Sequence, residues 1–150
     1  MSNTQIMRIL IIDDNPALVS VFAKILRVKG FFVTTETTFK EGVEHLKNES
    51  YNAVFVDAPL DDFDGKQILT LLQENHVFEK TNVFLFSSVD FNNIELDEWK
   101  KEGLYSHLKK PVKRSTVIKA LEDLPTKINF TSAMIPSEPI VKYENPIVNN

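Results

Sequence analysis

Short apolar runs rich in β-branched and aromatic residues recur in the chain, at residues 8–12, 51–57 and 83–86. The run at 8–12 is too short for a helix and shows no alternation of apolar and polar residues. Strands that are buried on both faces have this composition. The run at 51–57 stops at a carboxylate, Asp57, so the sequence predicts a covered strand with a potentially reactive group at its end.

Segments with helical periodicity lie between these runs. In the first, Leu18, Val21 and Phe22 begin a series at three- and four-residue spacing, Asn15 is a suitable N-cap, and Gly30 closes the helix. A later helix is expected to begin after an Asp64 cap. The remaining expected elements are strands at 31–35 and 105–108 and helices that include residues 39–46, 65–72, 92–101 and 117–124.

Strands and helices thus alternate five times within a single domain of ordinary length. Short connections between alternating strands and helices favour a parallel sheet with helices on both faces. The predicted fold class is therefore α/β, with a doubly wound, five-stranded parallel sheet.

Composition excludes several function classes. The net charge of -4 and the pI near 5.4 argue against a DNA-binding or membrane-binding surface, which needs clustered Lys and Arg. The absence of cysteine excludes disulfides. We expect a cytoplasmic protein, because the chain contains neither an apolar run of the ~18 residues that a membrane span needs nor a signal peptide.

The pattern changes after residue 124. Residues 125–150 contain four prolines and no helical period, which favours an exposed, flexible C-terminal tail after a domain at 1–124. Apolar stretches at 128–130 and 139–143 leave open the alternative that the tail docks on the domain or on a partner. No effector domain is expected.

Chemically useful residues follow four of the predicted strands. Asp13 and Asp14 follow the first, Asp57 the third, Ser87 the fourth, and Lys110 comes just after the fifth. Ligands of open parallel sheets bind at the carboxyl ends of the strands, so we expect these side chains to converge there.

Three converging carboxylates repel one another by ~1–4 kcal/mol per pair and need a compensating cation. Mg²⁺ suits oxygen ligands and leaves positions for phosphoryl oxygens. An Asp57 nucleophile that accepts a phosphoryl group, with Lys110 and Ser87 contacting it, fits this set. Taken singly, Asp13 and Asp14 could only cap a helix, and residues 57–64 could be a solvated acidic loop.

Over residues 6–124 the sequence resembles a response-regulator receiver domain, the phosphoacceptor module of two-component signalling. The resemblance rests on the Asp13-Asp14 pair, on Asp57 followed by Asp64-Gly65, on Ser87, and on Lys110-Pro111. It implies a flavodoxin-like sheet with strand order 2-1-3-4-5, an order that the periodicity itself does not supply.

The resemblance also implies site roles. Asp57 would be the phosphorylated residue, with Mg²⁺ held by Asp13, Asp14, Asp57 and the backbone carbonyl of Pro59. Ser87 would be the switch hydroxyl. Lys110 would be the family's lysine, because that residue directly precedes a proline that is often cis.

The implied function is a phosphorylation-dependent signalling switch. The phosphoryl group would come from a sensor histidine kinase, a phosphotransfer protein or a small phosphodonor. The output would be a downstream protein that binds a surface containing Trp99, Tyr105 and His107, and phosphorylation-linked dimerisation is possible. Beyond its own phosphorylation and dephosphorylation, no enzymatic activity is expected.

Three positions depart from the family pattern: Asp61, His107 and Val89, an apolar residue two positions beyond Ser87 that predicts slow self-dephosphorylation. Asp61 stands where the family usually has a proline, which adds negative charge near the site and predicts a freer loop. His107 stands where a Tyr or Phe is common. An ordinary edge-strand histidine is favoured there over a modified or pH-sensitive switch.

Two other functions remain open at this stage. A pseudo-receiver would keep the fold without cycling phosphate, and only Asp61 favours it. A phosphohydrolase of the haloacid-dehalogenase type would need its nucleophile after the first strand, in an Asp-x-Asp arrangement that Asp13-Asp14-Asn15 lacks.

Overall fold

The structure is a computed structural model that describes residues 6–125. Strands and helices alternate along this part of the chain, with a single 3-10 helix before the fourth strand. In order, the elements are β1 (Arg8–Ile12), α1 (Pro16–Val28), β2 (Phe32–Glu36), α2 (Phe39–Asn48), β3 (Ala53–Asp57), α3 (Gly65–Glu74), η1 (Val77–Glu79), β4 (Asn82–Ser87), α4 (Asn93–Glu102), β5 (Leu104–Lys109) and α5 (Arg114–Glu122).

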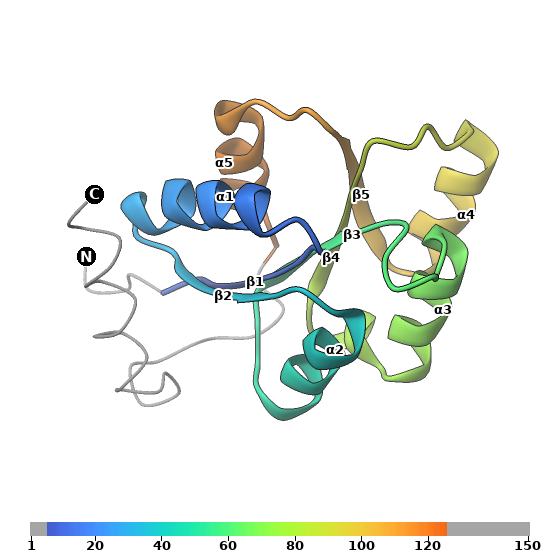
Figure 1. Cartoon of the computed structure of the whole chain (residues 1–150). Coiled ribbons are helices and arrows are strands. Elements are labelled where there is room, and N and C mark those ends of the chain that lie inside the picture. The colour runs from blue at the N-terminus through green and yellow to red at the C-terminus, as the bar shows by residue number, and fades with distance from the viewer. Residues whose placement is uncertain (1–5, 126–150) are drawn as a thin grey trace.

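The strands form one parallel sheet in the order β2-β1-β3-β4-β5. Helices α1 and α5 cover one face, and α2, α3 and α4 cover the other (Figure 1). The predicted doubly wound α/β fold is confirmed, and so is the strand order that the family resemblance implied. Because all strands run the same way, their carboxyl ends meet at one edge.

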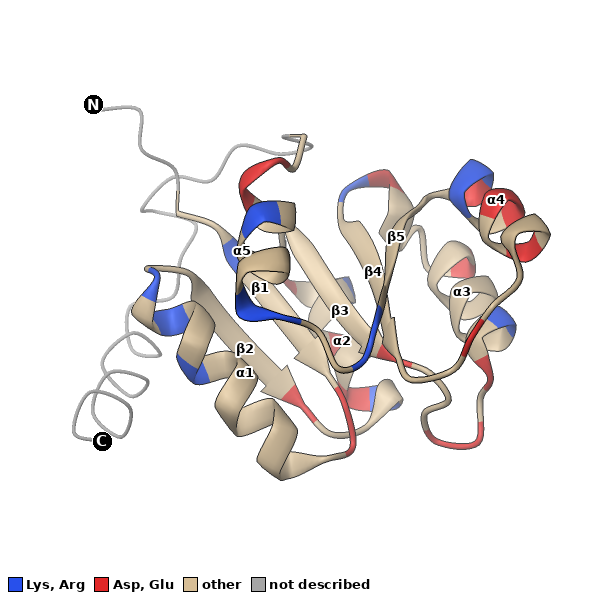
Figure 2. Ribbon diagram, turned by 90° about the horizontal axis from the view of Figure 1, so that it is seen from above, with Lys and Arg blue, Asp and Glu red and all other residues tan. Residues whose placement is uncertain are grey.

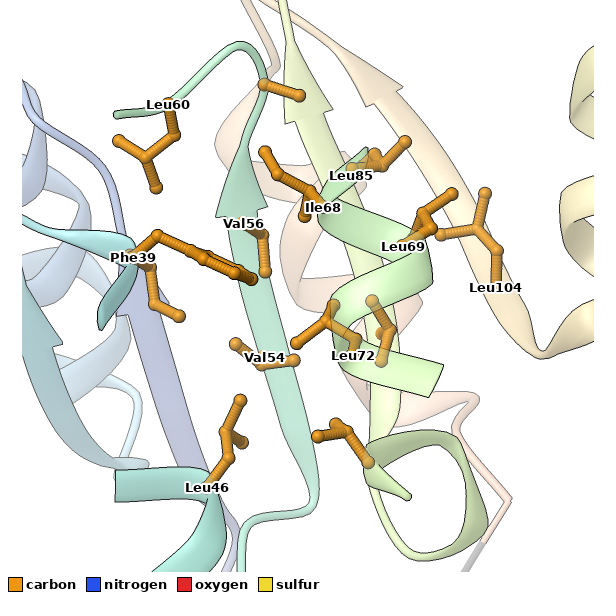
Figure 3. Packing of buried hydrophobic residues seen from close by; sticks show 14 of the residues in the cluster. Phe39, Leu46, Val54, Val56, Leu60, Ile68, Leu69, Leu72, Leu85 and Leu104 are labelled. Carbon is orange, nitrogen blue, oxygen red and sulfur yellow. The ribbon is translucent and has the colours of Figure 1, made fainter. Parts of the chain in front are cut away.

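The core is divided by the sheet into two apolar clusters. On one face, Phe55 and Phe84 stack with ring centroids 4.6 Å apart beneath α1 and α5. On the other face, Val56 and Ile68 pack with residues of α2 and α3 (Figure 3). These side chains are fully buried, and each contributes about 1.5–3 kcal/mol of hydrophobic stabilisation, which holds the strand ends in fixed positions.

Side-chain caps begin four of the five long helices. The side chain of Asn15 accepts a hydrogen bond from the Leu18 amide, and Pro16 occupies the first helical position, as the sequence predicts. Asp64 and Gln67 form a reciprocal capping box at the start of α3. At the starts of α2 and α4, the side chains of Thr38 and Asn92 accept the backbone amides of Glu41 and Glu95. Each cap fixes the point at which the loop after the preceding strand ends and the helix begins.

The third strand begins later than its composition suggests. Tyr51 and Asn52 are buried but precede β3, which begins at Ala53. The Asn52 side-chain oxygen accepts a hydrogen bond from the Arg8 amide at 2.8 Å. The η1 turn at Val77–Glu79 was not predicted at all.

A buried arginine anchors the amino-terminal edge of the sheet. Arg8 is 3% exposed, and its guanidinium donates to Glu49 at 2.6 Å while lying over the ring of Tyr51. Burial alone would raise the pKa of Glu49, but hydrogen bonds from Arg8 and Tyr51 outweigh it and lower that pKa. The ion pair is thus compensated, as a buried charge requires.

The predicted tail lies almost wholly outside the described residues. At its start, the backbone carbonyl of Pro125 accepts a hydrogen bond from the Asn82 side chain at 3.3 Å. Among residues 6–125, no helix is both long enough and apolar enough to cross a membrane.

The capping box makes α3 sensitive to one substitution. Asp64→Ala removes the acceptor for the Gln67 amide, so the free energy of unfolding should fall by about 1 kcal/mol. Urea denaturation would measure this loss as a lower midpoint concentration with an unchanged m-value. Lys66→Ala, an exposed change in the same turn, is the control and should be nearly neutral. A variant at position 64 as stable as the wild type would contradict the assignment.

Candidate functional site

The fold brings the predicted site residues together at the carboxyl edge of the sheet. Asp13 follows β1, Asp57 is the last residue of β3, and Lys110 follows β5. In Figure 2, acidic segments coloured red gather at the strand ends, and a blue segment follows β5. Residues nearly a hundred positions apart therefore share one site.

The ammonium of Lys110 bridges two carboxylates. Its Nζ lies 2.8 Å from Oδ2 of Asp13 and 3.1 Å from Oδ1 of Asp57. It also lies 4.9 Å from the ring centroid of Phe86, a cation–π contact that further stabilises the ammonium. Asp13 is 1% exposed, and its other oxygen accepts a hydrogen bond from the Asn15 amide at 2.9 Å.

Asp14 completes an acidic cluster. One ligand oxygen from each of Asp13, Asp14 and Asp57 lies within 4.8 Å of the others. The Lys110 ammonium balances only one of the three charges, so the cluster retains an excess of negative charge. Hard oxygen donors at this spacing fit a hard divalent cation such as Mg²⁺.

The electrostatics of the site depend on burial and on Lys110. Burial raises the pKa of Asp57, and the negative charges of Asp13 and Asp14 act in the same direction, while Lys110 partly opposes them. Burial would lower the pKa of Lys110, but its hydrogen bonds with Asp13 and Asp57 outweigh burial and raise it. The lysine therefore carries its charge at neutral pH.

Ser87 lies at the end of β4 and is fully buried. Its hydroxyl donates to the carbonyl of Ala58, the residue directly after Asp57, and accepts from the Val89 amide at 3.0 Å. The serine is thus beside the site, with its proton directed to the loop backbone.

Pro59 and Pro111 flank the site. Pro59 lies in the loop after β3 and is exposed, and the Ala58–Pro59 peptide bond is cis. The Lys110–Pro111 bond is also cis, in agreement with the family resemblance. The backbone amide of Lys110 donates to the Ser87 carbonyl, which ties the ends of β4 and β5 together.

Asp61 does not join the acidic cluster. Its carboxylate instead accepts a hydrogen bond from the Phe39 amide, at the beginning of α2. The loop is therefore attached to a helix, which differs from the freer loop that the sequence led us to expect. Composition gave no signal for this contact, since Asp61 and Phe39 are distant in the chain.

The three aromatic positions predicted for the output surface lie in different environments. Trp99 is only 6% exposed and packs on Phe91, so it lies beneath the surface of α4. Tyr105 packs on Phe84 at the opposite face of the sheet. His107 contacts Phe91 with centroids 5.0 Å apart, and burial lowers its pKa.

An apolar groove adjoins the site between α1 and α5. It encloses about 430 Å³. Lys110 lies at its edge, and its walls include the exposed side chain of Val21.

Comparison with known proteins agrees with this geometry. The family model of the response regulator receiver domain matches residues 9–122. The transcriptional regulatory protein GlrR of Escherichia coli is 24% identical over 115 residues, which cover 77% of this chain and 25% of GlrR. Hybrid signal transduction histidine kinase B of Dictyostelium discoideum is 25% identical over 127 residues, covering 76% of this chain and 6% of that protein. The chain thus spans a quarter or less of these curated relatives.

Solved structures show the same fold. A CheY-like receiver domain from Methanospirillum hungatei superimposes with a TM-score of 0.67 at 23% identity, covering 79% of this chain and 92% of that one. The receiver domain of the sensor histidine kinase PA1611 from Pseudomonas aeruginosa, with a magnesium ion coordinated in its active-site cleft, gives 0.66 at 21% identity, with coverage of 79% and 97%. With the family match over most of its length and the acidic site in place, the chain belongs to the response-regulator receiver domain family of two-component signalling.

Proposed function

We propose that this receiver domain is a signalling switch that is phosphorylated on Asp57. The observation that supports the proposal best is the bridge from Lys110 to Asp57 and Asp13, beside a third carboxylate on Asp14. This arrangement offers an acceptor oxygen, a cation and a metal site at the same place. A pseudo-receiver would not need all three.

The metal site would consist of Asp13, Asp14, Asp57 and the Pro59 carbonyl. When bound, Mg²⁺ would neutralise excess carboxylate charge and the charge of the incoming phosphoryl oxygens. The magnesium-bound receiver domain from Pseudomonas aeruginosa supports this assignment.

The chemical step is the transfer of one phosphoryl group. A carboxylate oxygen of Asp57 attacks the phosphorus of a phosphohistidine, an O–P bond forms, and the P–N bond breaks with its electron pair going to the imidazole nitrogen. The kinase-type relative supports a sensor histidine kinase or a phosphotransfer protein as donor. Lys110 holds a phosphoryl oxygen and offsets its negative charge.

Ser87 connects this step to the rest of the domain. In the structure its hydroxyl donates to the Ala58 carbonyl. A phosphoryl oxygen on Asp57 is a charged and therefore stronger acceptor, so the hydroxyl would leave Ala58 and bind the phosphoryl group. The loop between β4 and α4 follows Ser87 and would move with it.

The output surface would be formed by α4 and β5. Phe91 of the moving loop contacts both Trp99 and His107, so its displacement alters the packing beneath that surface. Ile94 of α4 is 73% exposed and is available for a downstream protein. The switching unit would comprise residues 1–124, followed by the tail at 125–150.

Beryllofluoride, which mimics a phosphoryl group, tests the switch directly. With Mg²⁺ it should change the fluorescence of Trp99 in a saturable manner, because the Phe91 contact is rearranged. Asp57→Ala should abolish the response. No response in the wild type, or an equal response in the Asp57 variant, would refute the proposal.

Lys110→Met tests the charge balance of the site. Removing the ammonium removes the hydrogen bond that opposes burial, so the pKa of Asp57 should rise further. A carbon-13 NMR titration of the Asp57 carboxyl group measures this change. The control is Lys109→Met, since Lys109 is exposed and pairs with Asp90 instead. An unchanged pKa in the Lys110 variant would contradict the role assigned to the lysine.

A further inference from the structure

The loop after Asp57 contains a tight turn with an unusual backbone. Leu60 and Phe63 exchange two backbone hydrogen bonds, each of 2.9 Å, around Asp61 and Asp62. Both central residues have positive φ, 52° and 69°, which defines a two-residue turn of the primed type. A proline, whose φ is fixed near about -65°, cannot occupy position 61 in this turn.

The side chain of Asp61 fixes this turn to α2. Its Oδ2 accepts the Phe39 amide at 2.5 Å, and Phe39 is the first residue of the helix. That amide would otherwise lack an intrahelical partner, and a carboxylate is also favoured at the positive end of the helix dipole. The contact is therefore a charge-assisted cap supplied from outside the helix.

Apolar packing reinforces the contact. Phe63 lies against Phe39 with ring centroids 5.7 Å apart. Leu60 is 1% exposed and belongs to the same buried cluster as Phe39, and both are labelled in Figure 3. The turn is thus held by the Asp61 hydrogen bond, by the ring contact of Phe63 with Phe39 and by the burial of Leu60.

The loop has a second attachment at its other end. The Ala58 carbonyl accepts the hydroxyl proton of Ser87. The proposed phosphorylation breaks that bond, whereas the contact between Asp61 and Phe39 involves no residue of the acidic cluster. The two attachments therefore differ, since only the one at Ala58 is released on phosphorylation.

We infer that Asp61 is a positioning residue, which clamps the loop to α2 and so keeps the Pro59 backbone in place for the metal site. This inference rests on the proposed function. Because Asp61 stands where the family usually has a proline, the sequence led us to expect a freer loop. The contact with Phe39 instead gives the loop a fixed geometry. Asp61 acts through Phe39 and the turn, without contacting the metal.

Two substitutions that cause the same kind of backbone strain test whether Asp61 holds the loop on α2. Asp61→Ala and Asp62→Ala each place alanine at a positive φ and remove one charge, but only the first removes the bond to Phe39. Asp61→Ala should weaken Mg²⁺ binding about tenfold, the low end for residues that orient metal ligands, and Asp62→Ala should leave it nearly unchanged. Isothermal titration calorimetry with Mg²⁺ alone measures both affinities.

A conservative variant separates positioning from charge. Asparagine tolerates positive φ and keeps a side-chain oxygen that can accept the Phe39 amide proton, so Asp61→Asn should restore most of the affinity. Hydrogen exchange at the Phe39 amide should be faster in Asp61→Ala than in Asp61→Asn or the wild type.

The outcomes distinguish the inference from the function on which it rests. A wild-type chain that binds no Mg²⁺ refutes the proposed function and the positioning role together. If the wild type binds Mg²⁺, equal affinities in Asp61→Ala and the wild type overturn the positioning role alone. Unchanged exchange at Phe39 in Asp61→Ala shows that the clamp itself is absent.

Discussion

The ammonium of Lys110 is the interaction on which the site depends. It follows β5, at one edge of the sheet, and reaches the carboxylates at the ends of β3 and β1. Without it, the buried Asp13 and the partly buried Asp57 would face each other as uncompensated charges, which is strongly unfavourable. The parallel order of the strands and the two apolar clusters are what place these ends within reach. The charge balance of the site therefore depends directly on the fold.

The sequence predicted the elements well where local chemistry decides them. Helix α1 begins with an Asn15 cap and Pro16, and α3 begins with Asp64, as their residue types require. The strand β3 begins two residues after the start of its apolar run, and the Asn52 side chain just before it binds Arg8, a partner distant in sequence. The burial of Arg8 also depends on such partners, since Glu49 and two aromatic rings compensate its charge. Local sequence patterns do not predict such contacts, because the partners are distant in the chain.

The same distinction applies to the site. Convergence of Asp13, Asp57 and Lys110 was predictable, because the ends of parallel strands meet at one edge. The environments of the remaining residues were not. Trp99 is buried rather than exposed, and Asp61 binds the start of α2 rather than enlarging the acidic cluster. Both follow from the packing of elements that periodicity cannot place relative to one another.

The central claim is that Asp57 is the phosphoryl acceptor of this receiver domain. Mass spectrometry of the full chain, after incubation with a small phosphodonor and Mg²⁺, tests it most directly. We predict the addition of one phosphoryl group, located on Asp57 by peptide fragmentation and dependent on the metal ion. A chain that gains no phosphoryl group, or that gains one on another residue while Asp57 stays unmodified, would contradict the account.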